Sequence, residues 1–483
     1  MDAHPLVRDY FGEQLRSERS EAWLECNLRL YNYYRTLAPQ LPDSFREMEP
    51  LFLAVICGCN AGLFREALHE VYSPRIQRGD SSFAAIVLGA RGALLLVLAH
   101  FFEHGRWGSL VEPGVDEQSL TAEDQLFILM QAGSCLMVTR GLGAPEARIC
   151  YERAEPLCQS LNQPRVQCLA LRCQWRYCLV TDKLSVAIQI AERGYSLAQE
   201  QNDAALKVGA CADLAANLFF LGDFEPARRY ARHGVQIWRS GGVKFPPEDL
   251  DTPVFSCLCH GALSEWHLGE IASWHATVAE AIALAKELND LHALAVLLLW
   301  ATIVGHFERN PAKVARLASD LIELSTRQNF AFWLAGGEIL RGWARSVSGD
   351  TAESISWIED GIEDWRATGS TLMVPYYLGL KAEALHLANR TSKALEAIAE
   401  AQAMVERSEE RWWSTELHRL RAVFLTALGA GHVQIEASFC EAIRIAKEQK
   451  SVSLEKRAGA TYAEYRRQKA SKPGRQKLRL PLC

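Results

Sequence analysis

The residues of this chain that come closest to a catalytic spacing are two histidines and a glutamate: His100, Glu103 and His104. Histidines four residues apart share one face of a helix and can ligate zinc, with the glutamate between them as the base that activates a water. Gly105 follows directly and places His104 at the end of any such helix. We therefore interpret them as ordinary histidines near a helix end, and we expect no metal site.

The fourteen cysteines do not form a metal-binding pattern either. In Cys57-Gly-Cys59 and Cys257-Leu-Cys259 only one residue separates the thiols, and no second pair completes a set of four ligands. Three further cysteines, Cys168, Cys173 and Cys178, are five residues apart, which places them about 140° apart around a helix. Buried, reduced thiols are the expected state, as in a cytoplasmic protein.

Motifs for phosphate binding and nucleophilic catalysis are missing from the sequence. It has no Gly-x-x-x-x-Gly-Lys-Ser/Thr loop, because the dipeptide Gly-Lys does not occur at all. It also has no Gly-x-Gly-x-x-Gly after a strand pattern and no Gly-x-Ser-x-Gly. We expect no enzymatic activity and no cofactor.

Composition and charge limit the kinds of partner and the location that we expect for this protein. The chain has 483 residues, 49% of them hydrophobic, and a formal charge of −6, which argues against a surface built to bind nucleic acid. Its richest apolar stretch, residues 84–102, contains Arg91 and His100, so no membrane span is expected. The opening MDAHPLVRDYFGEQL has no apolar core of a signal peptide. We expect a cytoplasmic protein.

A repeat of about 40 residues runs along most of the chain. Small residues mark one position of successive helical segments, with spacings of 40, 40, 47, 40, 40, 40 and 41 residues. In order, these positions are Ala154, Gly194, Gly234, Ala281, Leu321, Gly361, Ala401 and Ala442. A second series on the preceding helices, from Ala215 to Ala422, lengthens at the same place, Lys244–Pro253, by seven residues. Two series in step indicate stacked helical hairpins.

Turn residues fall between the two helices of each repeat, for example Gly222-Asp223 and Asn389-Arg390. Period-two runs of Val, Ile and Thr are absent, so no sheet competes with the helical pattern. The sequence therefore predicts an all-α fold, an α-solenoid of tetratricopeptide-like (TPR-like) hairpins.

Three regions are expected along the chain. Residues 1–115 form an N-terminal helical segment without the repeat register, and Gly105–Ser119 is the candidate linker. Residues 121–463 form the superhelical repeat domain, in which Thr121 and Asp124 have the spacing of an N-cap and its reciprocal partner. Residues 464–483 form a basic tail that we expect to be disordered.

Several strings resemble a known family. Leu291–Leu428, with QNFAFWLAGGEILRGWARS, GIEDWRATGS and SEERWWSTELHRLRAVFL, resembles the tetratricopeptide-type C-terminal region of bacterial predicted ATPases and cyclase-associated regulators. The front strings HPLVRDYFGEQLRSERSEAW and CNAGLFREALHEVY resemble the stretch after the nucleotide-binding and winged-helix parts of signal-transducing ATPases. The chain looks like the repeat portion without its ATPase. It departs from the family pattern at Ser73-Pro74, which puts a helix there in doubt, and at Glu409, where the pattern favours Gly.

The resemblance and the repeat together suggest where a partner would bind. In such solenoids the first helix of each hairpin lines the concave wall. The polar residues on the first helices that match the family pattern are Arg341, Glu383, Glu416, His418, Arg419 and Arg421. They are the candidate interaction residues, and the alternative is that several pair with one another between stacked helices.

Two functions remain open. The first is a non-catalytic scaffold or sensor that binds a protein or peptide segment, or a small effector. The second is the regulatory sensor arm of a signalling ATPase, nucleotide cyclase or transcriptional regulator whose catalytic domain lies on another chain or is lost. The sequence does not identify the partner or the oligomeric state.

Overall fold

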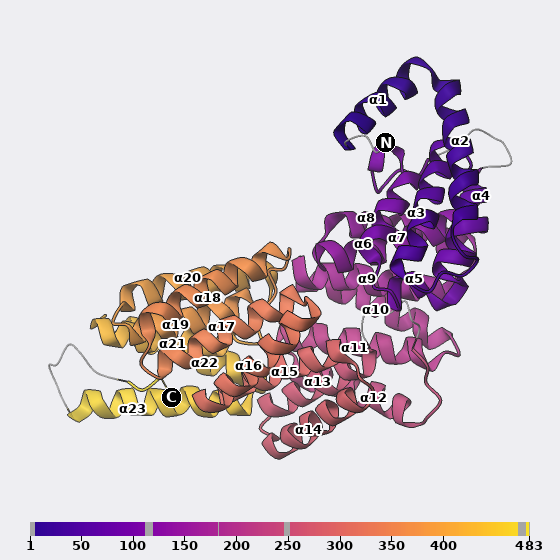
Figure 1. Ribbon diagram of the computed structural model, residues 1–483. Helices are drawn as coiled ribbons and strands as arrows, with labels where there is room; N and C mark the ends of the chain where they lie inside the picture. Colours follow the sequence, from indigo (N-terminus) through magenta and orange to yellow (C-terminus); the bar gives the residue numbers. More distant parts are fainter. Residues whose placement is uncertain (1–4, 112–118, 182, 246–251, 472–479, 483) are drawn as a thin grey trace. The chain divides into compact units, whose positions relative to one another are not determined.

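The computed structural model of the chain is an array of helices (Figure 1). It describes residues 5–111, 119–181, 183–245, 252–471 and 480–482. Within these residues no strand is present, and the nearest feature is one isolated antiparallel bridge between Phe102 and Leu110. The all-α fold class, a solenoid of TPR-like helix pairs, is confirmed.

Backbone contacts divide the chain into two compact units, one built from Met1–Ala170 and the other from Leu171–Phe245 together with Asp251–Cys483. We call them unit 1 and unit 2. The boundaries expected at residues 115, 121 and 463 stay predictions.

Unit 1 combines irregular short helices with one regular helix pair. Its elements are α1 (Pro5–Glu18), α2 (Ser20–Leu37), α3 (Phe45–Asn60), α4 (Phe64–Glu66), η1 (Ala67–Gln77), η2 (Gly79–Ser81), α5 (Phe83–Ile86), α6 (Arg91–Leu98), η3 (Ala99–Phe101), η4 (Glu103–Gly105), α7 (Ala122–Arg140) and α8 (Pro145–Ser160). The helix pair α7–α8 begins with the capping box predicted from sequence: Asp124 N donates to Thr121 Oγ1 at 3.2 Å, and Thr121 N donates to Asp124 Oδ2 at 3.0 Å.

The doubtful helix at Ser73-Pro74 is a π-helix, η1, which continues through Pro74. Proline has no amide hydrogen and its ring crowds the carbonyl four residues earlier, so it breaks an ordinary α-helix. Here the helical segment nevertheless continues past the proline, as α3 continues past Pro50 and α8 past Pro156. The segment ends at Arg78, whose φ of +55° turns the chain.

Arg75 in η1 caps the end of α2. Its side chain is 7% exposed, and it donates to four backbone carbonyls: Arg35 O at 2.7 Å, Pro39 O at 2.9 Å, and Ala38 O and Gln40 O at 3.2 Å. The last carbonyls of a helix have no partner within the helix. The buried guanidinium of Arg75 therefore supplies hydrogen-bond donors to carbonyl groups at the end of α2 and in the following turn.

Unit 2 contains the remaining helix pairs. In order, the helices are α9 (Pro164–Thr181, which begins in unit 1), α10 (Leu184–Glu200), α11 (Ala204–Leu221), α12 (Phe224–Arg239), α13 (Pro253–His267), α14 (Ile271–Glu287), α15 (Leu291–Phe307), α16 (Pro311–Gln328), α17 (Ala331–Val347), α18 (Thr351–Ala367), α19 (Val374–Leu387), α20 (Thr391–Ser408), α21 (Ser414–Leu428), α22 (His432–Glu448) and α23 (Val452–Ser471). Each odd-numbered helix from α7 to α21 is the first of a pair and each even-numbered helix is the second.

The small residues of the repeat lie where helices touch. A Cβ added to Gly234 of α12 would stand 2.6 Å from Cys257 Sγ and 3.0 Å from Cys211 Cβ, so α12 packs closely on both α11 and α13. A Cβ on Gly361 of α18 would stand 2.7 Å from Ile339. Interiors tolerate no such overlap, which explains the period of Ala and Gly.

Unit 2 coils so that a later part of the chain caps an earlier one. Thr371 N donates to Val180 O at 2.8 Å, and Arg411 N donates to Phe220 O at 2.8 Å; both contacts join residues 191 positions apart. Ser453 Oγ donates to Trp266 O at 2.6 Å in the same way. Val180 O and Phe220 O belong to the last turns of α9 and α11, so the segments before α19 and α21 satisfy groups that these first helices leave open. Trp266 O of α13 accepts from Ser453 of α23 in addition to Gly269 N at 3.1 Å.

Glu410 ties two of these capping segments together. Its carboxylate accepts from Met373 N at 2.9 and 3.1 Å and from Trp412 Nε1 at 2.8 Å, and it is 2% exposed. Burial raises the pKa of Glu410 to about 7, although both hydrogen bonds favour the charged form. Its neighbour Glu409 has a φ of +65°, which is the left-handed position for which the family pattern favours Gly.

Two further sequence expectations concern the ends and loops. The insertion at Lys244–Pro253, which we expect to form a protruding loop, lies largely outside the described residues, and α13 begins at its last residue. Helix α23 extends to Ser471, so residues 464–471 of the expected disordered tail are helical, and residues 472–479 lie outside the description. Tyr465, which is fully buried against α22, anchors this part of the helix.

In the part of the chain that the structure describes, one helix, α11, is long and apolar enough to cross a membrane by length and composition, and 78% of its apolar window is buried inside the fold.

We expect Arg75→Met to destabilise unit 1 selectively. Methionine keeps the length of the side chain but removes every donor, which leaves the carbonyls at the end of α2 unpaired at a cost of about 2–4 kcal/mol. Hydrogen–deuterium exchange should show faster exchange in α2 and η1 with no change in α15–α21. The exposed Arg46→Met in α3 is the control, and equal exchange in the two variants would contradict the capping role.

We expect Glu410→Gln to change how stability depends on pH. The wild-type carboxyl has a pKa of about 7 in the folded chain, against an ordinary value of 4.5, so the folded chain holds an extra proton between these two pH values. Wild-type stability therefore falls as pH rises from about 4.5 to 7, by up to about 3 kcal/mol from this group. Glutamine keeps an acceptor and removes this titration.

Urea unfolding at pH 5 and pH 8, followed by tryptophan fluorescence, measures the difference. The gain of the Gln variant over wild type should be larger at pH 8 by about 2–3 kcal/mol. Glu406→Gln, on the exposed face of α20, should show no such difference. Parallel pH profiles for wild type and Glu410→Gln would contradict the assignment.

Candidate functional site

The residues with catalytic spacing do not come together as a site. His100 lies in η3, whereas Glu103 and His104 lie in η4, and His104 has a φ of +50°, so the two histidines do not share a helix face. Among the described residues no group of three or more His, Cys, Asp or Glu is arranged to hold a metal. Cys57, Cys59, Cys257 and Cys259 are buried, and burial raises the pKa of the Cys57 thiol to about 11.

The structure divides the six predicted interaction residues into two groups. Glu383, Glu416 and Arg419 are buried, with exposed fractions of 1%, 0% and 0%, and lie in one ion network. The other three lie apart from it: Arg341 stacks over the Trp357 ring of α18 at 4.9 Å, His418 lies 3.3 Å from Gln402 Nε2 of α20, and Arg421 is exposed.

The buried network joins α19, α21, α23 and the end of α15. Arg309, directly after α15, pairs with Glu383 of α19 and with Glu416 of α21 at 2.8 Å. Arg419 donates from Nε and Nη2 to both oxygens of Glu416, at 2.9 and 2.7 Å. Arg457 of α23 lies 3.5 Å from Glu416 and donates to Phe307 O. Glu416 and Arg419 pair with each other within α21, whereas Glu383 and Glu416 are joined across helices by Arg309, which is not one of the six. Contact of any of the six residues with a partner stays a prediction.

Electrostatics keep this network charged. Burial would raise the pKa of Glu383, but Arg309 and His306 outweigh it and hold that pKa well below 4.5. The same balance, with Arg419 and Arg457 as the main cations, lowers the pKa of Glu416. His306 lies between two polar side chains: its Nε2 is 3.4 Å from Glu383 Oε1 and its Nδ1 is 3.0 Å from Tyr376 OH. Burial lowers the pKa of His306 to about 4, so its ring is neutral at pH 7.

Aromatic rings fill the rest of the interior of unit 2. Phe307 stacks on Trp413 with ring centroids 4.5 Å apart, and Phe219 lies 5.4 Å from Trp412. Trp343, Tyr376 and Trp412 are each at most 1% exposed. The first helices thus face an interior occupied by the chain's own side chains, and the open surface must be sought elsewhere.

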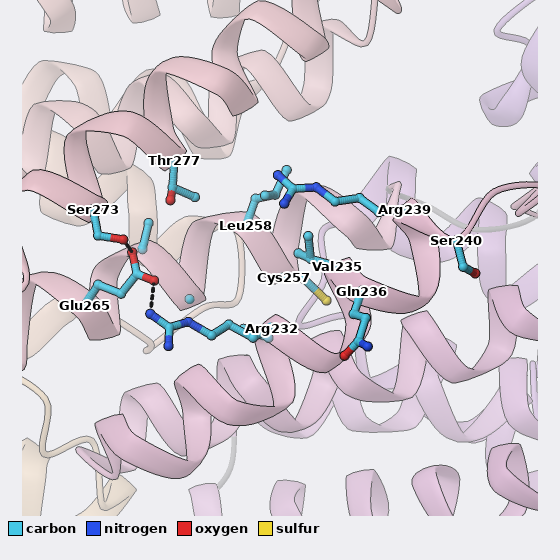
Figure 2. A pocket seen from close by; sticks show the side chains of 13 residues that line it. Arg232, Val235, Gln236, Arg239, Ser240, Cys257, Leu258, Glu265, Ser273 and Thr277 are labelled. Atoms are coloured by element: carbon cyan, nitrogen blue, oxygen red, sulfur yellow. Dashed lines mark hydrogen bonds and ion pairs between the residues drawn. The ribbon is translucent and has the colours of Figure 1, made fainter.

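A cavity of about 650 Å³ lies between two second helices, α12 and α14, above the first helix α13 (Figure 2). One wall is the face of α12 that carries Arg232, Val235, Gln236 and Arg239. The floor is the face of α13 with Cys257, Leu258, Gly261, Ala262 and Glu265, and the far wall is Ser273 and Thr277 of α14. Its volume is within the range of ligand sites.

Three ion pairs join α12 to α13, to Glu270 and to α14 around this cavity. Arg232 Nη2 lies 2.9 Å from Glu265 Oε1, a contact that Figure 2 shows crossing the opening, and 3.1 Å from Glu270 Oε2. Arg239 Nη2 lies 2.5 Å from Glu280 Oε1 on α14. At this cavity α12 and α13 pack closely, because a Cβ added to Gly261 would lie 3.0 Å from the Ala231 Cβ.

The sequence interpretation missed this cavity, although two signals were available. The pair of helices around it carries an unusual density of small residues, Ala231, Gly234, Gly261 and Ala262. The seven-residue insertion also falls between α12 and α13, in this repeat alone of those in the series. Neither signal indicates a cavity by itself, because small residues usually mark close packing.

Comparisons with known proteins give distant similarities. No protein-family model matches the chain. An uncharacterized protein of Rhizobium meliloti (strain 1021) is 22% identical over 351 residues, which are 71% of this chain, and the chain spans about a third (34%) of the length of this relative.

Solved structures with a similar helical arrangement are distant in sequence. A Rap protein complexed with Competence and Sporulation Factor has a TM-score of 0.46 at 10% identity, and the match covers 72% of this chain and 99% of that one. The human IFIT1 dimer with m7Gppp-AAAA has a TM-score of 0.43 at 14% identity, covering 92% and 86%. A signal transduction ATPase (STAND) protein with a tetratricopeptide repeat sensor from Pyrococcus horikoshii has 0.35 at 11%, covering 89% and 74%. The expected exclusion of nucleic acid stays a prediction.

We expect Arg419→Ala to destabilise unit 2 by about 3–5 kcal/mol, because it leaves the buried Glu416 with less compensation. Arg421→Ala, two residues further along the same helix and exposed, should change stability by less than about 0.5 kcal/mol. Circular dichroism during urea unfolding measures both. Equal stability of the two variants would show that Arg419 is not part of a structural network.

Proposed function

We propose that the chain is a non-catalytic interaction module that binds a segment of a partner protein in the cavity between α12 and α14. The observation that supports this is the contrast between an occupied interior and an open cavity with an apolar floor and a polar rim. Binding sites commonly combine a mainly apolar lining with a few polar groups that orient the ligand.

The walls of the cavity suit a segment of polypeptide. Over the nine residue steps from Ala231 to Ser240, α12 offers a wall about 13 Å long. An extended peptide of four residues has the same length. Gln236, Ser273 and Thr277 provide donors and acceptors for its backbone, as peptide recognition requires in addition to apolar contact.

A second candidate function is the regulatory sensor arm of a signalling ATPase, nucleotide cyclase or transcriptional regulator. The relative from Rhizobium meliloti, which is about three times as long as the aligned part, favours the idea that such repeats occur beside further domains. In this proposal the chain acts in the cytoplasm of a bacterium and a domain on another chain performs the catalysis.

We expect Thr277→Trp to weaken partner binding by at least about tenfold, because an indole on the α14 wall fills the cavity. Ala276→Trp, at the neighbouring exposed position, is the matched control and should change affinity by less than about twofold. A partner is first captured with the full chain and identified by mass spectrometry, and its affinity for each variant is then measured by calorimetry. Equal affinities for wild type and Thr277→Trp would refute the cavity as the binding site.

Neither proposal gives this chain a reaction of its own. We expect the purified chain to show no turnover of ATP above background in a phosphate-release assay, since its sequence has no phosphate-binding loop. Turnover that a single substitution in this chain abolishes would overturn the non-catalytic assignment.

A further inference from the structure

Three residues that follow α23 in the sequence return to the first helix α21. They are Leu480, Pro481 and Leu482, which form no helix, and we call them the returning segment (Figure 1). Leu482 O accepts from Arg419 Nη2 at 2.9 Å. Because Arg419 is fully buried, the returning segment reaches an arginine of the ion network rather than a group on the outer surface.

Arg419 offers a hydrogen-bond donor whose position is fixed. Its Nε and Nη2 donate to the two oxygens of Glu416, at 2.9 and 2.7 Å, and its Nη1 lies 3.4 Å from Thr461 Oγ1 of α23. Glu416 is itself held by Arg309 at 2.8 Å and by Arg457 at 3.5 Å. The second hydrogen of Nη2 therefore points in one direction, and a buried donor without an acceptor costs free energy. A main-chain carbonyl placed there satisfies Arg419 whatever side chain accompanies it.

The burial of the returning segment alternates along the chain. Leu480 is 9% exposed, Pro481 is exposed and Leu482 is half-buried. Successive side chains of an extended backbone point to opposite sides, so this alternation is that of an extended peptide with its two leucines toward the fold. Proline in the outward position has no amide hydrogen that would need an acceptor. A bound main-chain carbonyl together with alternate side chains against the protein is a common mode of peptide recognition.

The contacts of the returning segment are those of a weakly bound ligand. Among the described residues, its hydrogen bonding to the helices is the contact of Leu482 O with Arg419, and Leu480 is its buried side chain. These gains oppose the entropy that is lost when three residues are ordered. Eight residues, 472–479, connect the segment to α23, and a ligand tethered by so few residues meets its site at an effective concentration on the order of millimolar. Tethering retains a weak ligand, yet a competing segment can exchange with it.

We propose that Arg419 and Thr461 mark a binding site for an extended, leucine-containing peptide, and that the returning segment occupies this site as an internal ligand. A partner protein binds there when a segment of the same chemistry, with leucines two positions apart, takes the place of Leu480–Leu482. The site is formed by α21 and α23, and neither Arg419 nor Thr461 lines the cavity between α12 and α14. It is therefore a second site, and Thr277→Trp should leave it unaffected.

A labelled copy of the returning segment tests this site in the full chain. The probe is Gly-Arg-Leu-Pro-Leu-Gly-amide with a fluorophore at its amino end, and its control has Ser in place of the first Leu. In the chain, Leu480→Ser should release the returning segment, and Pro481→Ala, at the exposed neighbouring position, is the matched control. Both positions lie outside every described helix, so circular dichroism should show the same helix content in the three chains.

Fluorescence anisotropy should show that the probe binds Leu480→Ser about fivefold or more tightly than it binds wild type or Pro481→Ala. The reason is that an internal ligand lowers the apparent affinity of a competitor by the fraction of sites that it occupies. The control peptide should bind Leu480→Ser about fivefold or more weakly than the probe, because it lacks the leucine that is buried in the site. Equal affinity of the probe for wild type and Leu480→Ser, or no binding to either at millimolar probe, would overturn the proposal.

Photo-cross-linking locates the bound probe. With a benzophenone side chain in place of its second Leu, the probe should label α21 or α23 of Leu480→Ser, as mass spectrometry of the digested chain reports. Labelling confined to other helices would contradict the site. A wild-type dimer in sedimentation that Leu480→Ser abolishes would assign the returning segment to a second copy of the chain, and would overturn its role as an internal ligand.

Discussion

The carbonyl groups at the ends of the first helices impose the constraint on which unit 2 depends. A helix leaves its last carbonyls without partners, and in a buried position each such group costs free energy. Here Val180 O and Phe220 O receive amides from residues 191 positions later, so one superhelical turn completes the hydrogen bonding of the turn before it. The rest of the interior follows from this closure, because helices held at that distance bring their inner side chains together.

The closure of the superhelical turn explains why charged residues are buried in the interior of unit 2. Glu383 and Glu416 lie 74 and 107 residues after Arg309 in the sequence. The stacking of the superhelical turns brings both within hydrogen-bonding distance of Arg309. Removing two such charges from water is costly, and mutual pairing offsets the cost when every group is satisfied. Their pairing geometry is compatible with one register of the turns, whereas the surrounding aromatic rings pack in many orientations.

The repeat, the helices and many caps could be predicted from the sequence because they depend on neighbouring residues. Gly234 and Gly361 marked helix contacts correctly, and the Thr121–Asp124 box formed as its spacing required. Even the exception Leu321 is local in origin, since Gly337 of the next helix leaves room for it, with a hypothetical Cβ 3.4 Å away. The number of repeats in one superhelical turn cannot be predicted from the sequence of a single repeat. Charged first-helix residues therefore could not be distinguished as interior or open from their spacing alone.

Helix α13 contacts the interior of unit 2 and also forms the floor of the cavity. Its contacts with the interior therefore determine how rigid that floor is. One face of α13 is fixed to the interior: His267 Nδ1 lies 3.0 Å from Ser451 Oγ, and Trp266 O accepts from Ser453. The opposite face, with Leu258, Gly261 and Ala262, is the floor of the cavity. Because contacts with α23 position α13, the floor of the cavity is already formed before the ligand of the proposed function binds. Binding then requires no ordering of that helix, and the free energy of contact is not offset by its immobilisation.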